Sequence, residues 1–415
     1  MRIYFSGIGG VGIGPLARIA RDAGYTVLGS DANESLTTKE LEDSAVTISY
    51  DQSGEFLRRS HAQEPIDWLV YTAALPQHHP ELLVARALGI KTTKRDELLA
   101  HIIDEKDLKL IAVAGTHGKT TTTGMLVWTL KQLGIPVSYS IGSTLSWGPS
   151  GHFDPSSAYF VYECDEFDRN FLHFSPYLSL ITSIEYDHPD TYPTEGDYQS
   201  AFRQFIHESN MAILWQKDAD YIKSRYPSAW SMQDDETLRI TLAGEHNRRN
   251  GTLVLKALER LTIGENLQNR RRLEQFPGTD RRFEKLADNL YTDYGHTPTE
   301  IQATLQLARE ISNNVVLVYQ PHQNIRQHEI RTQYTDEIFH DADEVYWLPT
   351  YLSREDPTLT ILAPTELTTQ LTTTRLHYAE LNKQLFIQIS EDRNNGSLVL
   401  LMGAGSIDNW IRSNI

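Results

Sequence analysis

The sequence has a single cysteine, Cys164, among 415 residues. One cysteine cannot form an intramolecular disulfide, and it excludes a metal site built from several thiolates. The chain also has no apolar run of about 18 residues, the length that a membrane-spanning helix needs, and no secretory signal follows Met1. We therefore expect a protein of the reducing cytoplasm, with no membrane span.

Basic residues are scarce relative to acidic ones. The chain has 38 lysines and arginines against 55 aspartates and glutamates, which gives a formal net charge of −17, and it has no basic run. A charge of this sign repels a nucleic-acid backbone, so we expect no nucleic-acid partner. A small anionic substrate stays open, because a local group of lysine, arginine and backbone N–H donors can hold it. The sequence does not indicate an oligomeric state.

Three times, a β-rich apolar run precedes a glycine turn and a helical pattern, which is typical of α/β units with parallel sheets. We expect an α/β protein of three domains: a Rossmann-like N-terminal domain over 1–107, a central P-loop ATPase-like parallel sheet over 108–275, and a Rossmann-like C-terminal domain over 276–415. The predicted strands are 2–5, 26–30, 68–71, 108–114, 158–162, 178–184, 315–319, 344–348 and 397–402.

The segment Gly115-Thr116-His117-Gly118-Lys119-Thr120 follows a predicted strand and opens a long amphipathic helix. In this setting, backbone N–H groups and the helix N-terminus bind phosphates, while the lysine contacts the terminal phosphates and the threonine hydroxyl binds Mg²⁺. Val113 stands where the common eight-residue P-loop has glycine, so the match is to the shorter G-T-x-G-K-T form. The coincidence of two glycines, a lysine and a threonine run favours ATP binding over a plain strand-to-helix turn.

A second glycine loop lies near the N-terminus. Gly7, Gly9 and Gly12 form G-x-G-x-x-G after a predicted strand, and Asp31 follows the next strand. The pattern is typical of domains that bring a diphosphate close to the backbone, whether it belongs to NAD, FAD or a UDP-sugar. A glycine turn that serves only helix packing is the alternative.

Two acidic clusters follow neighbouring predicted strands of the central domain. Residues 163–168 carry four carboxylates, and Glu185-Tyr186-Asp187-His188 forms the second cluster. The carboxyl ends of parallel strands are where open α/β sheets bind ligands, and Mg²⁺ prefers oxygen ligands. The pair of clusters therefore favours a metal site beside the phosphate loop over two solvated acidic loops.

Together these residues resemble those of the Mur ligases, the ATP-dependent amide-forming enzymes of peptidoglycan synthesis, and most closely the branch that acts on UDP-N-acetylmuramic acid. The resemblance implies that ATP, with Mg²⁺, activates the lactyl carboxylate of UDP-N-acetylmuramic acid as an acyl phosphate, which L-alanine then attacks. In a recycling relative, the acceptor is instead a ready-made murein tripeptide. The matching segments are 7–13, 115–123, 163–168, 187–188, 244–250, 276–283, 293–300 and 320–322.

The resemblance also implies roles for single residues. The implied catalytic residues are Lys119, His188 and Arg282, and the implied Mg²⁺ ligands are Thr120, Glu163 and His188. ATP is expected to contact Gly115, Thr116, His117, Gly118, Lys119, Thr120, Thr121, Asn247, Asn250, Arg282 and Asp293. The UDP-sugar is expected at Gly7, Gly9, Gly10, Val11, Gly12 and Asp31, and the amino acid at Tyr294, His296, His322 and Arg326.

The chain departs from the members that use L-alanine at two positions of the expected amino-acid pocket. Thr297 stands where they have a second histidine, and Gln323 stands where they have an arginine. That arginine would help to hold the carboxylate of the amino acid. No lysine occurs between His188 and Lys217, so the carbamylated lysine of other Mur ligases is expected to be absent.

Two other classes of protein fit part of the pattern. A nicotinamide oxidoreductase would use the N-terminal glycine loop, but it leaves the loop at 115–120 and both acidic clusters without a role. A regulatory ATP-binding protein would use the loop at 115–120, but it leaves the N-terminal loop and Arg326 without one.

Overall fold

The computed structural model describes residues 1–72, 75–223, 226, 229–353 and 355–415. The chain divides into two compact units, which are described separately. The first comprises Met1–Thr237 and Gly251–Phe276, and the second comprises Leu238–Asn250 and Pro277–Ile415. The first unit contains two sheets and the second contains one, and all three are built mainly from parallel strands. The α/β fold class is confirmed, whereas the exact bounds of three domains stay a prediction.

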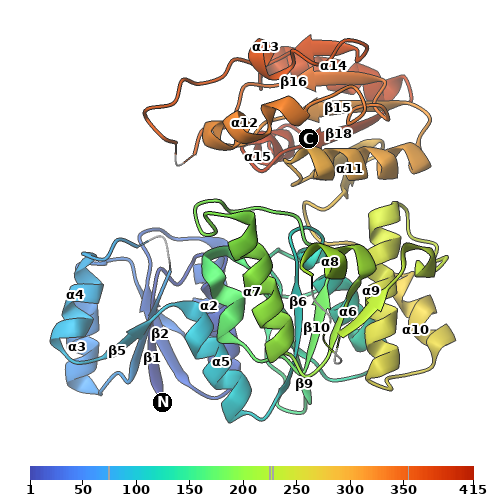
Figure 1. Ribbon diagram of the computed structural model, residues 1–415. Helices are drawn as coiled ribbons and strands as arrows, with labels where there is room; N and C mark the ends of the chain where they lie inside the picture. Colours follow the sequence, from blue (N-terminus) through green and yellow to red (C-terminus); the bar gives the residue numbers. More distant parts are fainter. Residues whose placement is uncertain (73–74, 224–225, 227–228, 354) are drawn as a thin grey trace. The chain divides into compact units, whose positions relative to one another are not determined.

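The N-terminal sheet has the strand order β3-β2-β1-β4-β5, and its pairs are parallel. Helices α3 and α4 pack on Tyr4 and Leu28 of one face, and α1, α2 and α5 pack on the other (Figure 1). The strands are β1 (Arg2–Ser6), β2 (Thr26–Ser30), β3 (Thr47–Ser49), β4 (Trp68–Tyr71) and β5 (Lys91–Thr93). The helices are α1 (Gly14–Asp22), α2 (Leu36–Asp43), α3 (Glu55–Gln63), α4 (Pro80–Ala87) and α5 (Arg95–Glu105).

The central sheet has the order β12-β11-β10-β6-β9-β7-β8, in which only the β7–β8 pair is antiparallel among the described strands. Its core is continuous with that of the N-terminal sheet, because Leu16, Leu98 and Phe160 belong to one buried cluster. The strands are β6 (Lys109–Ala114), β7 (Ser138–Ser140), β8 (Gly151–His152), β9 (Tyr159–Glu163), β10 (Leu178–Ile181), β11 (Ala212–Trp215) and β12 (Ala229–Met232). The helices are α6 (Lys119–Gln132), α7 (Glu195–Glu208), α8 (Gln216–Tyr221), α9 (Glu245–Arg260) and α10 (Asn266–Leu273), with a 3₁₀ segment at Phe167–His173.

The sheet of the second unit has the order β13-β14-β18-β15-β16-β17. Helix α11 packs on one face through Ile301 and Leu305, and α14 and α15 pack on the other through Leu385 and Ile407. The strands are β13 (Glu284–Ala287), β14 (Leu290–Asp293), β15 (Val315–Tyr319), β16 (Glu344–Trp347), β17 (Leu376–Tyr378) and β18 (Leu398–Met402). The helices are α11 (Pro298–Ile311), α12 (Asn324–Ile330), α13 (Pro364–Leu367), α14 (Lys383–Asn394) and α15 (Ile407–Arg412).

The order of strands fixes where ligands can bind. In open parallel sheets, ligands bind at the carboxyl ends of strands where the strand order reverses, as it does between β1 and β4 and between β6 and β9. The glycine loop follows β1 and the phosphate loop follows β6. Among the described residues, no helix is long and apolar enough to cross a membrane.

Candidate active site

The phosphate loop is held in shape by its neighbour strand. Gly115 has φ +132°, and a Cβ there would lie 2.3 Å from Thr182 Oγ1, so only glycine fits. Thr116 N donates to Ser183 O at 2.9 Å, and His117 N donates to Ser183 Oγ at 3.0 Å. Gly118, at φ +83°, is the residue from which α6 begins. The loop therefore delivers Lys119, Thr120 and Thr121 to the first turn of that helix.

Lys119 is held by a buried carboxylate. Its ammonium donates to Gly115 O at 2.6 Å and to Glu166 Oε2 at 2.6 Å, and its side chain is 15% exposed. Burial opposes the charge on Lys119, but Glu166 and Asp165 outweigh that effect and raise the lysine's pKa. Burial raises the pKa of Glu166, and Lys119 partly offsets this rise. The lysine is thus a fixed positive charge at the mouth of the phosphate loop.

Thr120 and Glu163 form a second contact beside this lysine. The Thr120 hydroxyl donates to Glu163 Oε1 at 2.7 Å, and Gly142 N donates to Glu163 Oε2 at 2.7 Å. A threonine hydroxyl and a carboxylate next to a phosphate loop are oxygen ligands of the kind that Mg²⁺ prefers. The structure brings these two sequence-predicted ligands together.

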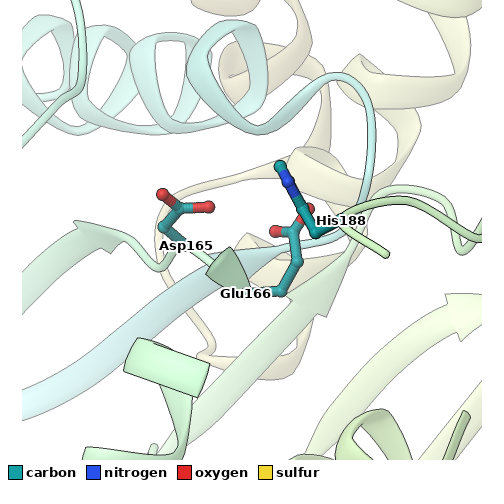
Figure 2. Close-up of side chains that lie close together, drawn as sticks. All are labelled: Asp165, Glu166 and His188. Atoms are coloured by element: carbon teal, nitrogen blue, oxygen red, sulfur yellow. The ribbon is translucent and has the colours of Figure 1, made fainter. Parts of the chain in front are cut away.

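His188 lies with two other carboxylates of the acidic cluster. Asp165, Glu166 and His188 each offer one ligand atom, and these atoms lie within 4.8 Å of one another (Figure 2). Among the described residues, Glu166 Oε1 is buried with no hydrogen-bond partner, and it lies 3.7 Å from His188 Nε2. A buried carboxylate oxygen without a donor is suited to a cation, so this group fits a divalent metal ion. The structure does not place Glu163 in this group.

The N-terminal glycine loop turns tightly between β1 and α1. Gly7 N and Ile8 N both donate to Ser30 O at 2.9 Å, which ties the loop to the end of β2. Gly9 N donates to Asp31 Oδ2 at 2.8 Å, and Gly10 N donates to Gly7 O at 3.1 Å. Asp31 therefore orders the loop in this structure, and Val11 is 74% exposed at its tip.

One cavity of the first unit joins the two loops. Its volume is about 240 Å³, and its lining includes Val11, Gly12, Lys119, Gly142 and Glu163. Residues of the glycine loop of the N-terminal sheet and the first residue of the helix after the phosphate loop thus border the same cavity.

Four residues of the second unit are predicted from the sequence to contact ATP. Asn247 and Asn250 lie in the first turns of α9, where Asn247 Nδ2 donates to Ala243 O at 2.9 Å and Asn250 is buried. Arg282 lies over the Tyr294 ring at 5.1 Å. Asp293, at the end of β14, accepts from Gly295 N at 2.7 Å, and burial raises its pKa to about 6 although Arg282 opposes the rise.

The four residues expected to line the amino-acid pocket lie together in the second unit. The His296 ring is 5.8 Å from Tyr294 and 5.4 Å from His322. Burial lowers the pKa of His322 to about 4, and His296 and Arg326 add to the effect. Burial also lowers the pKa of His296, and Arg326 adds to that effect. Arg326 therefore brings a positive charge to both histidines, while Arg281 and Arg282 lie over the Tyr294 ring.

Two charged residues of the first unit cannot be recognised as site residues from the sequence. Glu166 is one of four carboxylates in its run, and its pairing with Lys119 depends on a turn that no sequence pattern indicates. Arg95 lines the cavity but belongs to no sequence motif. Arg95 lies two residues beyond β5, and a strand of three residues has too short a pattern to indicate this position from the sequence.

The chain matches three protein-family models. These are "Mur ligase family, catalytic domain" over residues 2–107, "Mur ligase middle domain" over 113–236 and "Mur ligase, glutamate ligase domain" over 281–405. It is also 32% identical to a protein of Agathobacter rectalis over 98% of this chain and 96% of that protein. The chain belongs to the Mur ligase family, as the resemblance implied, and is an ATP-dependent ligase.

The relative from Agathobacter rectalis is a UDP-N-acetylmuramate–L-alanine ligase. A protein of the same name from Carboxydothermus hydrogenoformans is 30% identical over 98% of this chain and 95% of its own length. The solved UDP-N-acetylmuramate-alanine ligase of Thermotoga maritima has the same fold, with a TM-score of 0.75 at 23% identity over 100% of this chain and 98% of that one.

We expect the two metal-ligand groups to respond separately to substitution. Glu163→Gln removes a charge beside Thr120, and His188→Ala removes a nitrogen beside Glu166, so each should raise the Mg²⁺ concentration for half-maximal activity on the order of tenfold to hundredfold. Thermal stability should change much less. Asp190→Asn is the matched control, because Asp190 is an exposed carboxylate that accepts from Thr191 N. Mg²⁺ titrations that match the wild type in both variants would favour solvated carboxylates and a structural histidine.

Proposed function

We propose that this chain joins L-alanine to the lactyl carboxylate of UDP-N-acetylmuramic acid at the expense of ATP, in the cytoplasmic synthesis of peptidoglycan precursors. The observation that carries the proposal is the cavity that Gly12 and Lys119 both line. In this cavity the UDP-sugar contacts the glycine loop after β1, and the γ-phosphate of ATP contacts the phosphate loop after β6. The near full-length similarity to two UDP-N-acetylmuramate–L-alanine ligases supports the choice of substrates.

The reaction has two steps. A carboxylate oxygen of the lactyl group attacks the γ-phosphorus of ATP, ADP leaves, and an acyl phosphate forms. The amine of L-alanine then attacks the acyl carbon, loses its proton, and expels phosphate that keeps the attacking carboxylate oxygen. The protein supplies positioning and charge compensation rather than a covalent group.

Lys119 has the central part in the first step. Its ammonium sits where the phosphate loop can present the γ-phosphate, and it stabilises negative charge on the transferring phosphoryl group. Its contacts with Gly115 O and Glu166 restrict its side chain before ATP binds, so little ordering is left for the reaction itself. When ATP binds, its phosphates replace part of the contacts that the Lys119 ammonium makes with Gly115 O and Glu166.

Mg²⁺ would be held by Thr120 and Glu163 in one group and by His188, Glu166 and Asp165 in the other. The ion, when bound, offsets phosphate charge and so lowers the cost of bringing ATP, a diphosphate and a carboxylate together. The residues of the second unit take the roles that the resemblance gives them: Asn247, Asn250, Arg282 and Asp293 toward ATP, and Tyr294, His296, His322 and Arg326 toward the amino acid.

A phosphate-release assay tests the proposal. The protein is mixed with ATP and Mg²⁺, then with UDP-N-acetylmuramic acid, L-alanine or both, and product is followed by mass spectrometry. We expect steady turnover only when all three substrates are present, together with a product heavier than UDP-N-acetylmuramic acid by one alanine residue. Phosphate release that does not depend on UDP-N-acetylmuramic acid or L-alanine would contradict the proposal, as would hydride transfer to a nicotinamide.

The acceptor is expected to be free L-alanine, held by its carboxylate. Arg326 brings a positive charge to both His296 and His322, and a charge-assisted contact to a free α-carboxylate selects single amino acids. Gln323 stands where the resemblance implies an arginine, so the affinity for L-alanine should be modest and its KM correspondingly high. Gln323→Arg should lower this KM by roughly tenfold, the effect of one charge-assisted hydrogen bond.

The comparison for this prediction uses L-alanine, glycine, L-serine and the tripeptide L-Ala-γ-D-Glu-meso-diaminopimelate. L-alanine should give the highest kcat/KM for both the wild type and Gln323→Arg. Robust use of the tripeptide with negligible use of L-alanine would move the protein to the recycling branch.

A further inference from the structure

Arg95 lies where the two loops of the first unit meet, and it has no role in the reaction as described above. It is the first residue of α5 and lines the cavity together with Gly12 and Lys119. Its side chain is 33% exposed. A cation at the first position of a helix faces the positive end of the helix dipole, which is an unfavourable place for it. A local cost of this kind is expected where function selects the residue.

The guanidinium of Arg95 lies directly against the glycine loop. A Cβ on Gly12 would come within 2.6 Å of Arg95 Nη1, so any residue larger than glycine would displace the arginine. The third glycine of the G-x-G-x-x-G pattern therefore makes room for a side chain from another element. This contact places a planar cation beside the backbone that precedes α1.

Two carboxylates, Asp96 and Asp165, stabilise the positive charge of Arg95, and the contact with Asp96 is long. Asp96 is 2% exposed, and its Oδ1 accepts from Tyr162 OH at 2.8 Å. Arg95 Nε lies 3.5 Å from the same oxygen, which is longer than a charge-assisted hydrogen bond of about 2.8 Å. Asp96 thus orients the guanidinium. A guanidinium has five N–H donors, so donors remain for a ligand in the cavity.

We propose that Arg95 binds the diphosphate of the nucleotide-sugar in this cavity through its guanidinium. Two phosphate oxygens match the fork of an arginine, which lysine cannot reproduce. The contact with Gly12 favours the diphosphate over the lactyl carboxylate, because the glycine loop is the element that approaches a diphosphate. In the proposed function the lactyl carboxylate has to reach the γ-phosphate, which is assigned to Lys119. This inference rests on the proposed function and assigns one further residue to its substrate site.

Equilibrium binding without ATP or Mg²⁺ tests Arg95 apart from catalysis. The variants are Arg95→Gln, which removes the charge, and Arg95→Lys, which keeps the charge but loses the fork. The probes are UDP, UDP-N-acetylglucosamine and UDP-N-acetylmuramic acid, of which only the last has the lactyl carboxylate. Arg18→Gln is the control, because Arg18 pairs with Glu40 at 2.5 Å on the same sheet unit and does not line the cavity.

We expect Arg95→Gln to raise the Kd of all three probes by the same factor, roughly tenfold to hundredfold, and Arg95→Lys to raise it less. The Kd of ATP should stay within about threefold, as should every Kd of Arg18→Gln. Circular dichroism identifies a variant that fails to fold, and Arg95→Lys, which keeps the charge, then decides. Gly12→Ala should weaken UDP binding as well, because it displaces the guanidinium.

Unchanged Kd values for Arg95→Gln and Arg95→Lys would overturn the inference. A loss confined to UDP-N-acetylmuramic acid would overturn it too, because it would place the guanidinium on the carboxylate. The outcome is separable from that of the proposed function. Wild-type protein that ligates L-alanine while the Arg95 variants bind UDP normally would contradict only the Arg95 assignment, whereas wild-type protein that binds no UDP compound would contradict both.

Discussion

Lys119→Ala is expected to reduce the rate of ligation on the order of 10² to 10³, the cost of losing one preorganised donor to a developing charge. The fall should appear in kcat, because the ammonium acts on the transferring phosphoryl group rather than on the bound sugar. Binding of UDP-N-acetylmuramic acid without ATP should be little changed. An assay of phosphate release measures kcat, and a separate binding assay measures the Kd of UDP-N-acetylmuramic acid. Together they separate the effect on the reaction from the effect on binding.

The fold should survive this substitution. Glu166 loses its partner, but burial already raises the pKa of that carboxyl, so it can take up a proton instead of staying charged in a buried site. Lys39→Ala is the matched control, because Lys39 is 59% exposed and its ammonium pairs with the exposed Glu34. A Lys119→Ala enzyme that keeps most of the wild-type turnover would remove the phosphate loop from the mechanism.

Because Glu166 pairs with Lys119, we expect Glu166→Ala to lower the free energy of unfolding more than the other substitutions do. Glu166→Ala leaves the Lys119 ammonium, only 15% exposed, without the carboxylate that holds it at 2.6 Å. Removing one partner of a buried pair costs about 3 kcal/mol of the free energy of unfolding. Asp165, whose Oδ1 is 3.9 Å from the ammonium, compensates only in part. Urea unfolding followed by circular dichroism measures the loss.

A double-mutant cycle isolates this pair. Removing both side chains should cost at least 1 kcal/mol less than the sum of the two single substitutions, because neither charge is then left alone. Asp168→Ala is the control from the same acidic run, since its carboxylate is 45% exposed and pairs with the exposed Lys94. That surface pair should contribute about 0–1 kcal/mol. Additive effects of Lys119→Ala and Glu166→Ala would contradict the pairing.

Strands with strong apolar runs could be predicted from the sequence. Thr26–Ser30, Trp68–Tyr71 and Val315–Tyr319 have the bounds that their sequence patterns predict. The expected strand at 178–184 ends at Ile181, because the chain turns there to hold the phosphate loop through Thr182 and Ser183. Strands of three residues, such as β5 and β7, are too short to show a period of two.

Local motifs in the candidate site could also be predicted, whereas contacts between distant segments could not. The loop around Lys119 and the proximity of Thr120 to Glu163 follow from a strand-to-helix motif and a strand end. Glu166 differs from its acidic neighbours only because the backbone after β9 buries it, and Asp168 and Arg169 take left-handed conformations in the turn that follows. Arg95 and Gly12 are far apart in the sequence, and their contact depends on how β5 and β1 are placed in one sheet.

The central claim is that the lactyl carboxylate is activated by phosphorylation in a cavity shared by the two loops. The most direct test uses UDP-N-acetylmuramic acid with ¹⁸O at both oxygens of that carboxylate, incubated with the protein, ATP, Mg²⁺ and L-alanine. Mass spectrometry of the released phosphate should find one ¹⁸O atom for each amide formed, because the acyl phosphate passes its bridging oxygen to phosphate. Unlabelled phosphate beside a labelled product, or phosphate released without any amide, would contradict the account.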